Sequence, residues 1–301
     1  MGQSGDHYHA ESHSSFRSLF DEVRFLNIGH VCHDVASNGY LLGGTVSYAS
    51  LITKKLGIHS GVITSHGEDF QFEERFQNLQ IPLWNSGSLL TTCFENIYDG
   101  GNRTQYLRAQ ASKVQVPNDI QKLEKLQIIQ LGLIADEVDM TAMEQLPKDC
   151  LKGASIQGWL RDTDKNQKVF TKRPDLSLFE KLDIAFMSTE DLGTQQDLLP
   201  EILEIVPITV VTKGYQGARV YIDGKKLSYG AYPCEEVDPT GAGDVFSTSF
   251  LIAYNESHDI EDAVAFAHSA ASISIEGKGV HSLPTKEAVQ ERKEIYKKKY
   301  L

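Results

Sequence analysis

The chain has 301 residues, of which 41% are hydrophobic and 23% are charged, as in an ordinary soluble globular protein. Its formal net charge is −12 and its one basic cluster is Lys297-Lys298-Lys299, which argues against nucleic acid or an anionic membrane as a partner. Four widely spaced cysteines, no metal-ligand spacing and no apolar run near the roughly 18 residues of a membrane span predict a cytoplasmic protein with reduced thiols.

The first 20 residues are rich in Ser, His and Gly and show no hydrophobic period. Polar sequence without a pattern does not bury enough apolar surface to fold, so residues 1–20 are predicted to be a disordered tail. No linker or change of composition divides the remainder, and residues 21–301 are predicted to form one domain.

The first predicted strand, Val23–Gly29, ends in glycine and runs into a polar loop that reaches Asp34. Open α/β sheets bind ligands beyond the carboxyl ends of their strands. A carboxylate at that place accepts two hydroxyl hydrogen bonds and matches a vicinal diol, which makes Asp34 a candidate substrate-binding residue. A turn aspartate without any function is the alternative interpretation.

Two hairpins are predicted next. One covers residues 35–42 and is centred on Asn38-Gly39, and the other covers residues 91–110 and turns at Asp99–Asn102. Between them, Gly43-Gly44-Thr45 opens a helix.

From about residue 118 onward, short apolar runs alternate with helical patterns. Strands are predicted over 126–134, 154–157, 184–187, 208–212 and 218–222, and helices within 136–147, 175–182, 195–205, 241–254, 260–276 and 284–298. Short strands separated by helices indicate an α/β fold with a doubly wound, mostly parallel sheet.

Two loops that follow predicted strands carry residues with chemical potential. After the strand at 154–157, Gln157 can bond a substrate hydroxyl and Arg161 can offer a fork of donors to a phosphate. A plain surface loop is an equal alternative there. Val210–Ala218 contains Thr212, Lys213, Gly214 and Gly217, and its residues alone favour a structural hairpin.

The most distinctive stretch is Gly241-Ala242-Gly243-Asp244, which precedes an apolar helix. Free backbone N–H groups at a helix start bind anions, so all four residues are expected to turn a free N–H toward a ligand. Asp244 beside that site can accept a proton from an attacking hydroxyl. An anion site with a base suits phosphoryl transfer to an alcohol. An ordinary glycine-rich helix start with an acidic first turn is the alternative.

Asp238-Pro239-Thr240-Gly241-Ala242-Gly243-Asp244 resembles the Asp-Thr-x-Gly-Ala-Gly-Asp signature of the ribokinase-like (PfkB) carbohydrate kinases, with Pro239-Thr240 in place of the usual Thr-x order. The resemblance covers about residues 23–285, and no P-loop, dinucleotide or zinc motif competes with it. It implies an ATP- and Mg²⁺-dependent phosphotransferase, with Asp244 as the base and the amides of Gly241, Ala242 and Gly243, with Arg161, stabilising charge.

The same resemblance assigns further residues. Asp34, the Gly43-Gly44 backbone, Thr45 and Gln157 would hold the substrate, under a lid built from about 35–42 and 91–110. Thr212, Lys213, Gly214 and Gly217 would lie along the ATP phosphates. Asp191 would help to hold Mg²⁺ through water, with Glu190 as a fallback, although Ser188 and Asp191 are shorter than the family's Asn and Glu. Relatives are often activated by K⁺ and often dimerise through their lids.

The substrate is less defined. Tyr48 stands where the family's Gly-Gly-x-x-x-Asn pattern has Asn, and Gln157-Gly158-Trp159-Leu160-Arg161 with Cys32-His33-Asp34 resembles the inositol-kinase branch. A small polyol or sugar, with myo-inositol first, is therefore expected as the acceptor. A sugar or nucleoside kinase of the same family, or a family member that binds without catalysis, stays open.

Overall fold

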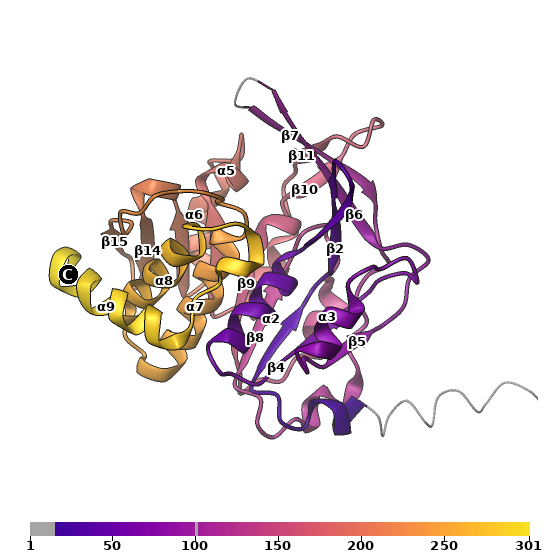
Figure 1. The fold of residues 1–301 in the computed structure, drawn as a ribbon, viewed down its shortest axis with the longest axis horizontal. Coiled ribbons are helices and arrows are strands. Elements are labelled where there is room, and N and C mark those ends of the chain that lie inside the picture. Colours follow the sequence, from indigo (N-terminus) through magenta and orange to yellow (C-terminus); the bar gives the residue numbers. More distant parts are fainter. Residues whose placement is uncertain (1–15, 100–101) are drawn as a thin grey trace, which may run out of the picture.

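A nine-stranded sheet forms the centre of the protein, with helices on both faces (Figure 1). The computed structural model describes residues 16–99 and 102–301. The strand order is β15-β14-β13-β12-β9-β8-β1-β4-β5, parallel from β13 to β5 and antiparallel at β14 and β15. The predicted mostly parallel, doubly wound sheet is confirmed.

The strands of this sheet are β1 Phe25–Ile28, β4 Ser60–Thr64, β5 Leu83–Asn85, β8 Ile128–Gly132, β9 Leu151–Ser155, β12 Ile184–Ser188, β13 Ile208–Thr212, β14 Ala218–Ile222 and β15 Lys225–Tyr229. The helices are α2 Thr45–Lys55, α3 Glu73–Asn78, α4 Met140–Glu144, α5 Thr189–Leu192, α6 Leu198–Ile205, α7 Ala242–Ser257, α8 Ile260–Ser274 and α9 Lys286–Tyr300.

A second, four-stranded sheet projects from the carboxyl edge of the first, and we call it the lid (Figure 1). Its strands are β2 Cys32–Ala36, β3 Gly39–Gly43, β6 Thr92–Asp99 and β7 Asn102–Ala109, in the order β3-β2-β6-β7. Both predicted hairpins are present in it, since β2 pairs with β3 and β6 pairs with β7, each antiparallel.

The central strands are buried on both faces, as short apolar runs between helices predict. One core lies under α4 and α6, and the other lies under α2, α7, α8 and α9. The turn into α2 depends on Gly44, whose φ is +92° and whose missing Cβ would lie 2.5 Å from the carbonyl oxygen of His30. In the described part of the chain, no helix combines the length and the apolar character needed to cross a membrane.

The structure corrects the predicted boundary of the N-terminal tail. Residues 16–20 are helical, and Phe16 and Phe20 stack at 4.6 Å between ring centroids within the core. The prediction of disorder is therefore wrong for residues 16–20, while residues 1–15 lie outside the described part. Five residues are too few to show a helical period.

Other differences concern short elements. The helical patterns at 136–147 and 175–182 contain only α4 and a 3₁₀ turn at Leu176–Lys181. A hairpin of β10 Arg161–Thr163 and β11 Val169–Thr171 was not predicted, and neither were β5 and β15. β5, β10 and β11 have three residues each and leave no alternation to detect, while β15, Lys225–Tyr229, is mostly polar. The new hairpin lies beside β7, where the backbone N–H of Leu107 donates to the carbonyl of Gln167.

Candidate active site

Most of the predicted site residues line one cavity of about 610 Å³, which we call the main cavity. It lies between the lid, the carboxyl ends of the central strands and the first turn of α7. The predicted residues on its wall are Asp34, Gly44, Thr45, Tyr48, Gln157, Arg161, Glu190, Asp191, Thr212, Gly241, Gly243 and Asp244. Residues from six separate predicted motifs thus meet at the place where open α/β sheets bind ligands.

A second cavity of about 460 Å³, the side cavity, adjoins the main one and shares Thr212 and Gly243 with it. Of the predicted residues, Gly214, Gly217 and Ala242 line it. Most of its remaining wall is apolar or aromatic, from Tyr215, Tyr232, Pro233, Phe246, Ala271 and Ile275. Gly43 and Lys213 line neither cavity.

Asp244 is positioned by the first turn of α7 and is partly buried. Burial raises the pKa of its carboxyl to about 6, against the opposing effects of a hydrogen bond from Thr45 and the charge of Arg161. The carboxylates of Asp191 and Asp34 add to the increase. At neutral pH the group is mostly ionised and has the basicity of a general base.

The first turn of α7 differs in one respect from its sequence prediction. The N–H of Ala242 donates to the carbonyl of Pro239 at 3.1 Å, so it is not free, and the prediction is wrong for this residue. Among the described residues, no protein acceptor pairs with the N–H groups of Gly241, Gly243 and Asp244. These three donors, at the start of a 16-residue helix, are of the kind that bind anions.

The ring of Tyr48 packs against the turn at Gly241. Gly241 has a φ of +79°, and a Cβ on it would lie 2.3 Å from Cδ1 of the Tyr48 ring. Burial, with the nearby carboxylates of Asp244 and Asp34, raises the pKa of the Tyr48 hydroxyl above its ordinary range. Tyr48 thus contributes an uncharged aromatic ring to the wall of the main cavity, next to Gly241.

Asp34 lies on β2, where the pairing of β2 with β3 turns its carboxylate toward the main cavity. Burial raises the pKa of its carboxyl to about 6, and the charges of Arg161 and Arg103 oppose this. Gly43 lies directly against it, because a Cβ at that position would be 2.2 Å from Oδ2 of Asp34. Gly43 therefore gives the carboxylate its space and does not form the cavity wall.

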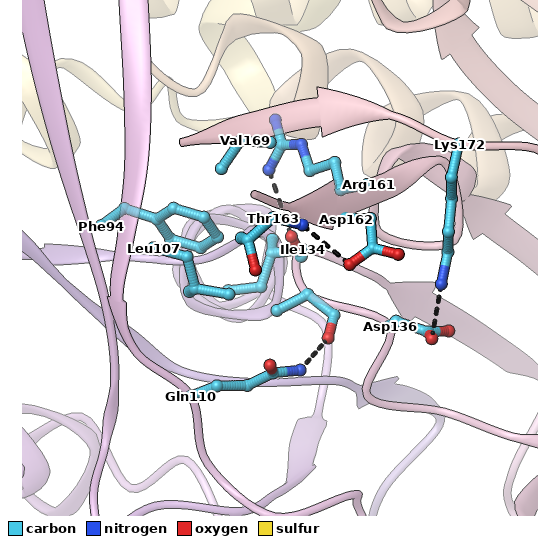
Figure 2. A pocket seen from close by; sticks show the side chains of 11 residues that line it. Phe94, Leu107, Gln110, Ile134, Asp136, Arg161, Asp162, Thr163, Val169 and Lys172 are labelled. Atoms are coloured by element: carbon cyan, nitrogen blue, oxygen red, sulfur yellow. Dashed lines mark hydrogen bonds and ion pairs between the residues drawn. The ribbon is translucent and has the colours of Figure 1, made fainter. Parts of the chain in front are cut away.

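A chain of polar contacts joins Arg161 to Asp244. Arg161 donates to Oε1 of Gln157 at 2.6 Å. It also donates to the carbonyl of Ile134 at 3.2 Å (Figure 2). Gln157 Nε2 lies 3.5 Å from Oγ1 of Thr45, whose hydroxyl hydrogen-bonds Asp244. The guanidinium is therefore held in place while part of its donor fork stays available.

The predicted metal residues form a weak ligand set. Oδ2 of Asp191 accepts hydrogen bonds from the N–H and the hydroxyl of Ser188, at 2.7 and 2.8 Å, in a capping box that begins α5. Glu190 is exposed beside it. No group of three or more His, Cys, Asp or Glu side chains that could hold a metal occurs in the described residues. This donor set fits Mg²⁺ that keeps several waters and is carried by phosphates.

Sequence reasoning missed polar residues on the lid and one within α8. Asn96 and Gln105 face each other across β6 and β7, with Gln105 Nε2 donating to Asn96 Oδ1 at 3.0 Å, and both line the main cavity, as does Arg103. The two-residue spacing of Phe94 with Asn96, and of Arg103 with Gln105, could have placed each pair on one face of its strand. His268 lines the side cavity, and its buried Nε2 has no hydrogen-bond partner among the described residues.

The fold and the main cavity place a carboxylate and unpaired helix N–H groups beneath a lid, an arrangement that suits phosphoryl transfer to an alcohol. Residues 31–286 match the model of the pfkB family carbohydrate kinases, and the chain belongs to this family.

Known relatives act on different acceptors. The chain is 27% identical over 276 residues to a nucleoside kinase of Methanocaldococcus jannaschii, covering 85% of this chain and 86% of that one. It is 26% identical over 273 residues to an inositol 3-kinase of Arabidopsis thaliana, covering 85% and 75%. The protein is therefore a sugar, nucleoside or inositol kinase.

Solved structures agree on the fold. The M. jannaschii nucleoside kinase superposes with a TM-score of 0.70 at 22% identity, covering 91% of this chain and 99% of that one. A pyrophosphate-dependent kinase of the ribokinase family, complexed with a pyrophosphate analog and myo-inositol, gives a TM-score of 0.72 at 21% identity, covering 88% and 99%. The prediction of a ribokinase-like fold is confirmed.

Proposed function

We propose that this protein transfers the γ-phosphate of ATP to a hydroxyl of a small neutral polyol or sugar, with myo-inositol as the first candidate. The observation that carries the proposal is that Asp34 and Asp244 line the same cavity as the unpaired N–H groups of α7. One carboxylate can hold the acceptor while the other takes its proton, and the amides face the phosphate.

In this mechanism Asp34 accepts hydrogen bonds from neighbouring hydroxyls and orients the acceptor. Asp244 takes the proton from the reacting hydroxyl as its oxygen attacks the γ-phosphorus and ADP leaves. The N–H groups of Gly241, Gly243 and Asp244, with Arg161, stabilise the charge that develops on the transferred phosphoryl group. Lid closure excludes water, so that phosphate is not lost to hydrolysis.

The donor loop is proposed to lie along the β13–β14 turn. Thr212 and the backbone of residues 213–217 would follow the phosphates. Gly217 lets this turn pack closely on the end of β15, since a Cβ would lie 2.0 Å from the carbonyl oxygen of Tyr229. Asp191, with Glu190 beside it, would hold Mg²⁺ through water, which would neutralise charge on the phosphates.

The side cavity supports a nucleotide donor. Its apolar wall suits the nucleobase of ATP, a group that pyrophosphate lacks. The unpaired, buried Nε2 of His268 offers the nucleobase a polar contact. Burial lowers the pKa of His268 to about 4, so the ring is neutral at pH 7. A neutral ring can donate or accept a hydrogen bond with a base.

The test of the proposed function uses purified protein with Mg²⁺, ATP or pyrophosphate, and myo-inositol, ribose, fructose or adenosine. The expected result is ADP release with ATP that depends on myo-inositol or another polyol, and no transfer from pyrophosphate. Turnover on adenosine alone would favour the second candidate, a nucleoside kinase, which the aromatic rings of Phe94 and Tyr48 in the main cavity also suit. No turnover with any acceptor, despite ATP binding, would reject catalysis.

The lid amides give a prediction about the acceptor. Asn96 and Gln105 can each donate and accept, as hydroxyl groups require, so Gln105→Leu is expected to raise KM for the polyol about tenfold, near the free energy of one to two hydrogen bonds. KM for ATP should stay unchanged. Ile97→Ala, on the same strand pair but 44% exposed and off the cavity wall, is the control. An unchanged polyol KM in Gln105→Leu would remove the lid amides from acceptor binding.

Two family properties remain proposals. Dimerisation through the lid is supported by Tyr40 and Leu41 on β3, which are 40% and 62% exposed, and sedimentation of Leu41→Lys tests it. Activation by K⁺ is tested by replacing K⁺ with Li⁺ in the assay. We also propose that the protein acts in the cytoplasm.

A further inference from the structure

Glu137 is a charged residue that the mechanism above does not use. Its side chain is fully buried in the loop that follows β8. Its carboxylate accepts hydrogen bonds from three backbone N–H groups, those of Ile134 at 3.0 and 3.1 Å, Ala135 at 2.7 Å and His30 at 3.0 Å. No salt bridge involves Glu137 within the described residues. A buried carboxylate held by amides alone depends on every one of those bonds.

His30 extends this network to the lid. Burial lowers the pKa of its ring, so the ring is neutral. Its Nε2 lies 2.9 Å from the carbonyl of Ser112 and must carry the proton, because a carbonyl only accepts. Its Nδ1, 2.8 Å from Oγ1 of Thr92, therefore accepts the hydroxyl proton, and the same oxygen accepts from the N–H of Ala111 at 3.0 Å.

These contacts lie at three of the points where the chain passes between the body and the lid. His30 precedes β2, Thr92 begins β6, and the 110–112 segment follows β7. Gln110 also donates to the carbonyl of Ala135 (Figure 2). The N–H of Ala135 in turn donates to Glu137. One carboxylate thus links the hinges of the lid to the loop after β8.

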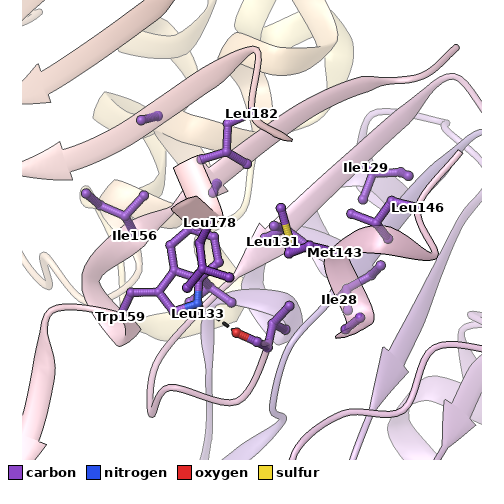
Figure 3. Close-up of a cluster of buried hydrophobic side chains, with 14 of the residues drawn as sticks. Ile28, Ile129, Leu131, Leu133, Met143, Leu146, Ile156, Trp159, Leu178 and Leu182 are labelled. Atoms are coloured by element: carbon purple, nitrogen blue, oxygen red, sulfur yellow. Dashed lines mark hydrogen bonds between the residues drawn. The ribbon is translucent and has the colours of Figure 1, made fainter. Parts of the chain in front are cut away.

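The same loop holds Arg161. The carbonyl of Ile134, whose N–H is bonded to Glu137, accepts from the guanidinium at 3.2 Å, and Asp136 pairs with Lys172 on the segment after β11 at 2.9 Å. The loop is backed by the core, since Nε1 of Trp159 donates to the carbonyl of Val138 at 2.8 Å (Figure 3). It is a rigid support between the body, the lid and Arg161.

Apolar packing accompanies these hydrogen bonds. A crevice of about 100 Å³ is lined by Phe94 and Leu107 of the lid and by Ile134 of the body (Figure 2). Phe94 and Ile134 belong to one buried apolar cluster, against which Leu107 packs, so the lid contacts the loop through this cluster as well as through the hydrogen bonds.

We propose that Glu137 is a positioning residue for phosphoryl transfer. It fixes two parts of the site relative to Asp244: the lid, which carries Asp34, and the loop that anchors Arg161. This inference rests on the proposed function. Glu137 touches neither cavity and acts through the backbone of residues 30 and 134–135.

The test is Glu137→Gln in the full chain. The new amide group places two donors against backbone donors, so at least one bond is lost with little change of volume. A displacement of about 1 Å can cost on the order of 10²-fold in rate. We expect kcat to fall by that order while KM for ATP stays within about twofold. Backbone amide hydrogen exchange should become faster in residues 30–36, 92–99 and 107–112, which contain the three hinges and the adjoining parts of the lid strands. It should stay slow in β1, β8 and β12 of the central sheet.

Thr53→Val at the far end of α2 is the matched control. It removes a buried hydroxyl that donates to the carbonyl of Ala49 at 2.9 Å, and it should lower Tm without changing kcat or hinge exchange. If Glu137→Gln does not fold, Thr92→Val removes the hydroxyl link alone and should show the same selective exchange. Exchange that is unchanged, or that quickens equally in hinges and sheet, would overturn the proposal. Because exchange needs no turnover, it still tests Glu137 if the proposed reaction itself is absent.

Discussion

Asp244→Asn is expected to lower kcat by about 10³- to 10⁴-fold, because the amide keeps the shape of the carboxylate but does not take the proton from the acceptor. The effect includes loss of a positioned base and of the negative charge near the acceptor hydroxyl. Binding of ATP should be retained, since the unpaired N–H groups of Gly243 and Asp244 and the side cavity stay intact. Steady-state kinetics with titration of nucleotide binding checks both parts, and near-normal turnover would contradict the mechanism.

The same variant should be more stable than the parent at neutral pH. The pKa of Asp244 is raised from 3.8 to about 6, so the fold disfavours its ionised form. The resulting loss of stability is absent below about pH 3.8, develops as pH rises toward 6, and is fully present above it. Asn avoids this cost, so Asp244→Asn should melt higher than the parent at pH 8 and equally near pH 4. A lower Tm at pH 8 would show that the carboxylate is stabilising.

Arg161→Met is expected to lower kcat by about 10²- to 10³-fold, the usual cost of losing one group that stabilises transition-state charge. A second effect distinguishes this role from simple misfolding. The charge of Arg161 lowers the pKa of both Asp34 and Asp244. Without it both pKa values rise above about 6, and the acid limb of the rate profile should move to higher pH. The pH dependence of kcat/KM measures this shift.

Arg161→Lys is the matched control for charge. Lysine keeps the positive charge but not the fork that binds Gln157 and the carbonyl of Ile134. Its rate should fall while its acid limb stays near that of the parent. An acid limb unchanged in Arg161→Met would mean that the guanidinium does not act on the two carboxylates.

The sequence predicted the features that depend on local pattern. Short apolar strands between helices identified the parallel sheet, and the position of Asp34 after the first strand identified a cavity residue. The Gly241–Asp244 turn could be located because a glycine-rich helix start is a local signal. Of the two glycines flanking Ala242, Gly241 makes room for the ring of Tyr48, and only the structure reveals this.

Other features depend on contacts between distant segments, and no local pattern contains them. The N–H of Ala242 is paired because Pro239 folds back on it, and Gly43 lies behind Asp34 because β3 pairs with β2. Glu137 looks like an ordinary loop carboxylate in the sequence, yet it bonds the N–H of His30, which lies 107 residues away. Single residues that bridge separate elements are found only when the tertiary structure is known.

The most direct test of the central claim is product formation by the parent protein and Asp244→Asn, each with ATP, Mg²⁺ and the polyol that gives the highest turnover, followed by ³¹P NMR. The account predicts a phosphomonoester of the acceptor with the parent protein and almost none with the variant, although both bind ATP. Equal yields from the two proteins, or free phosphate in place of the ester, would contradict it.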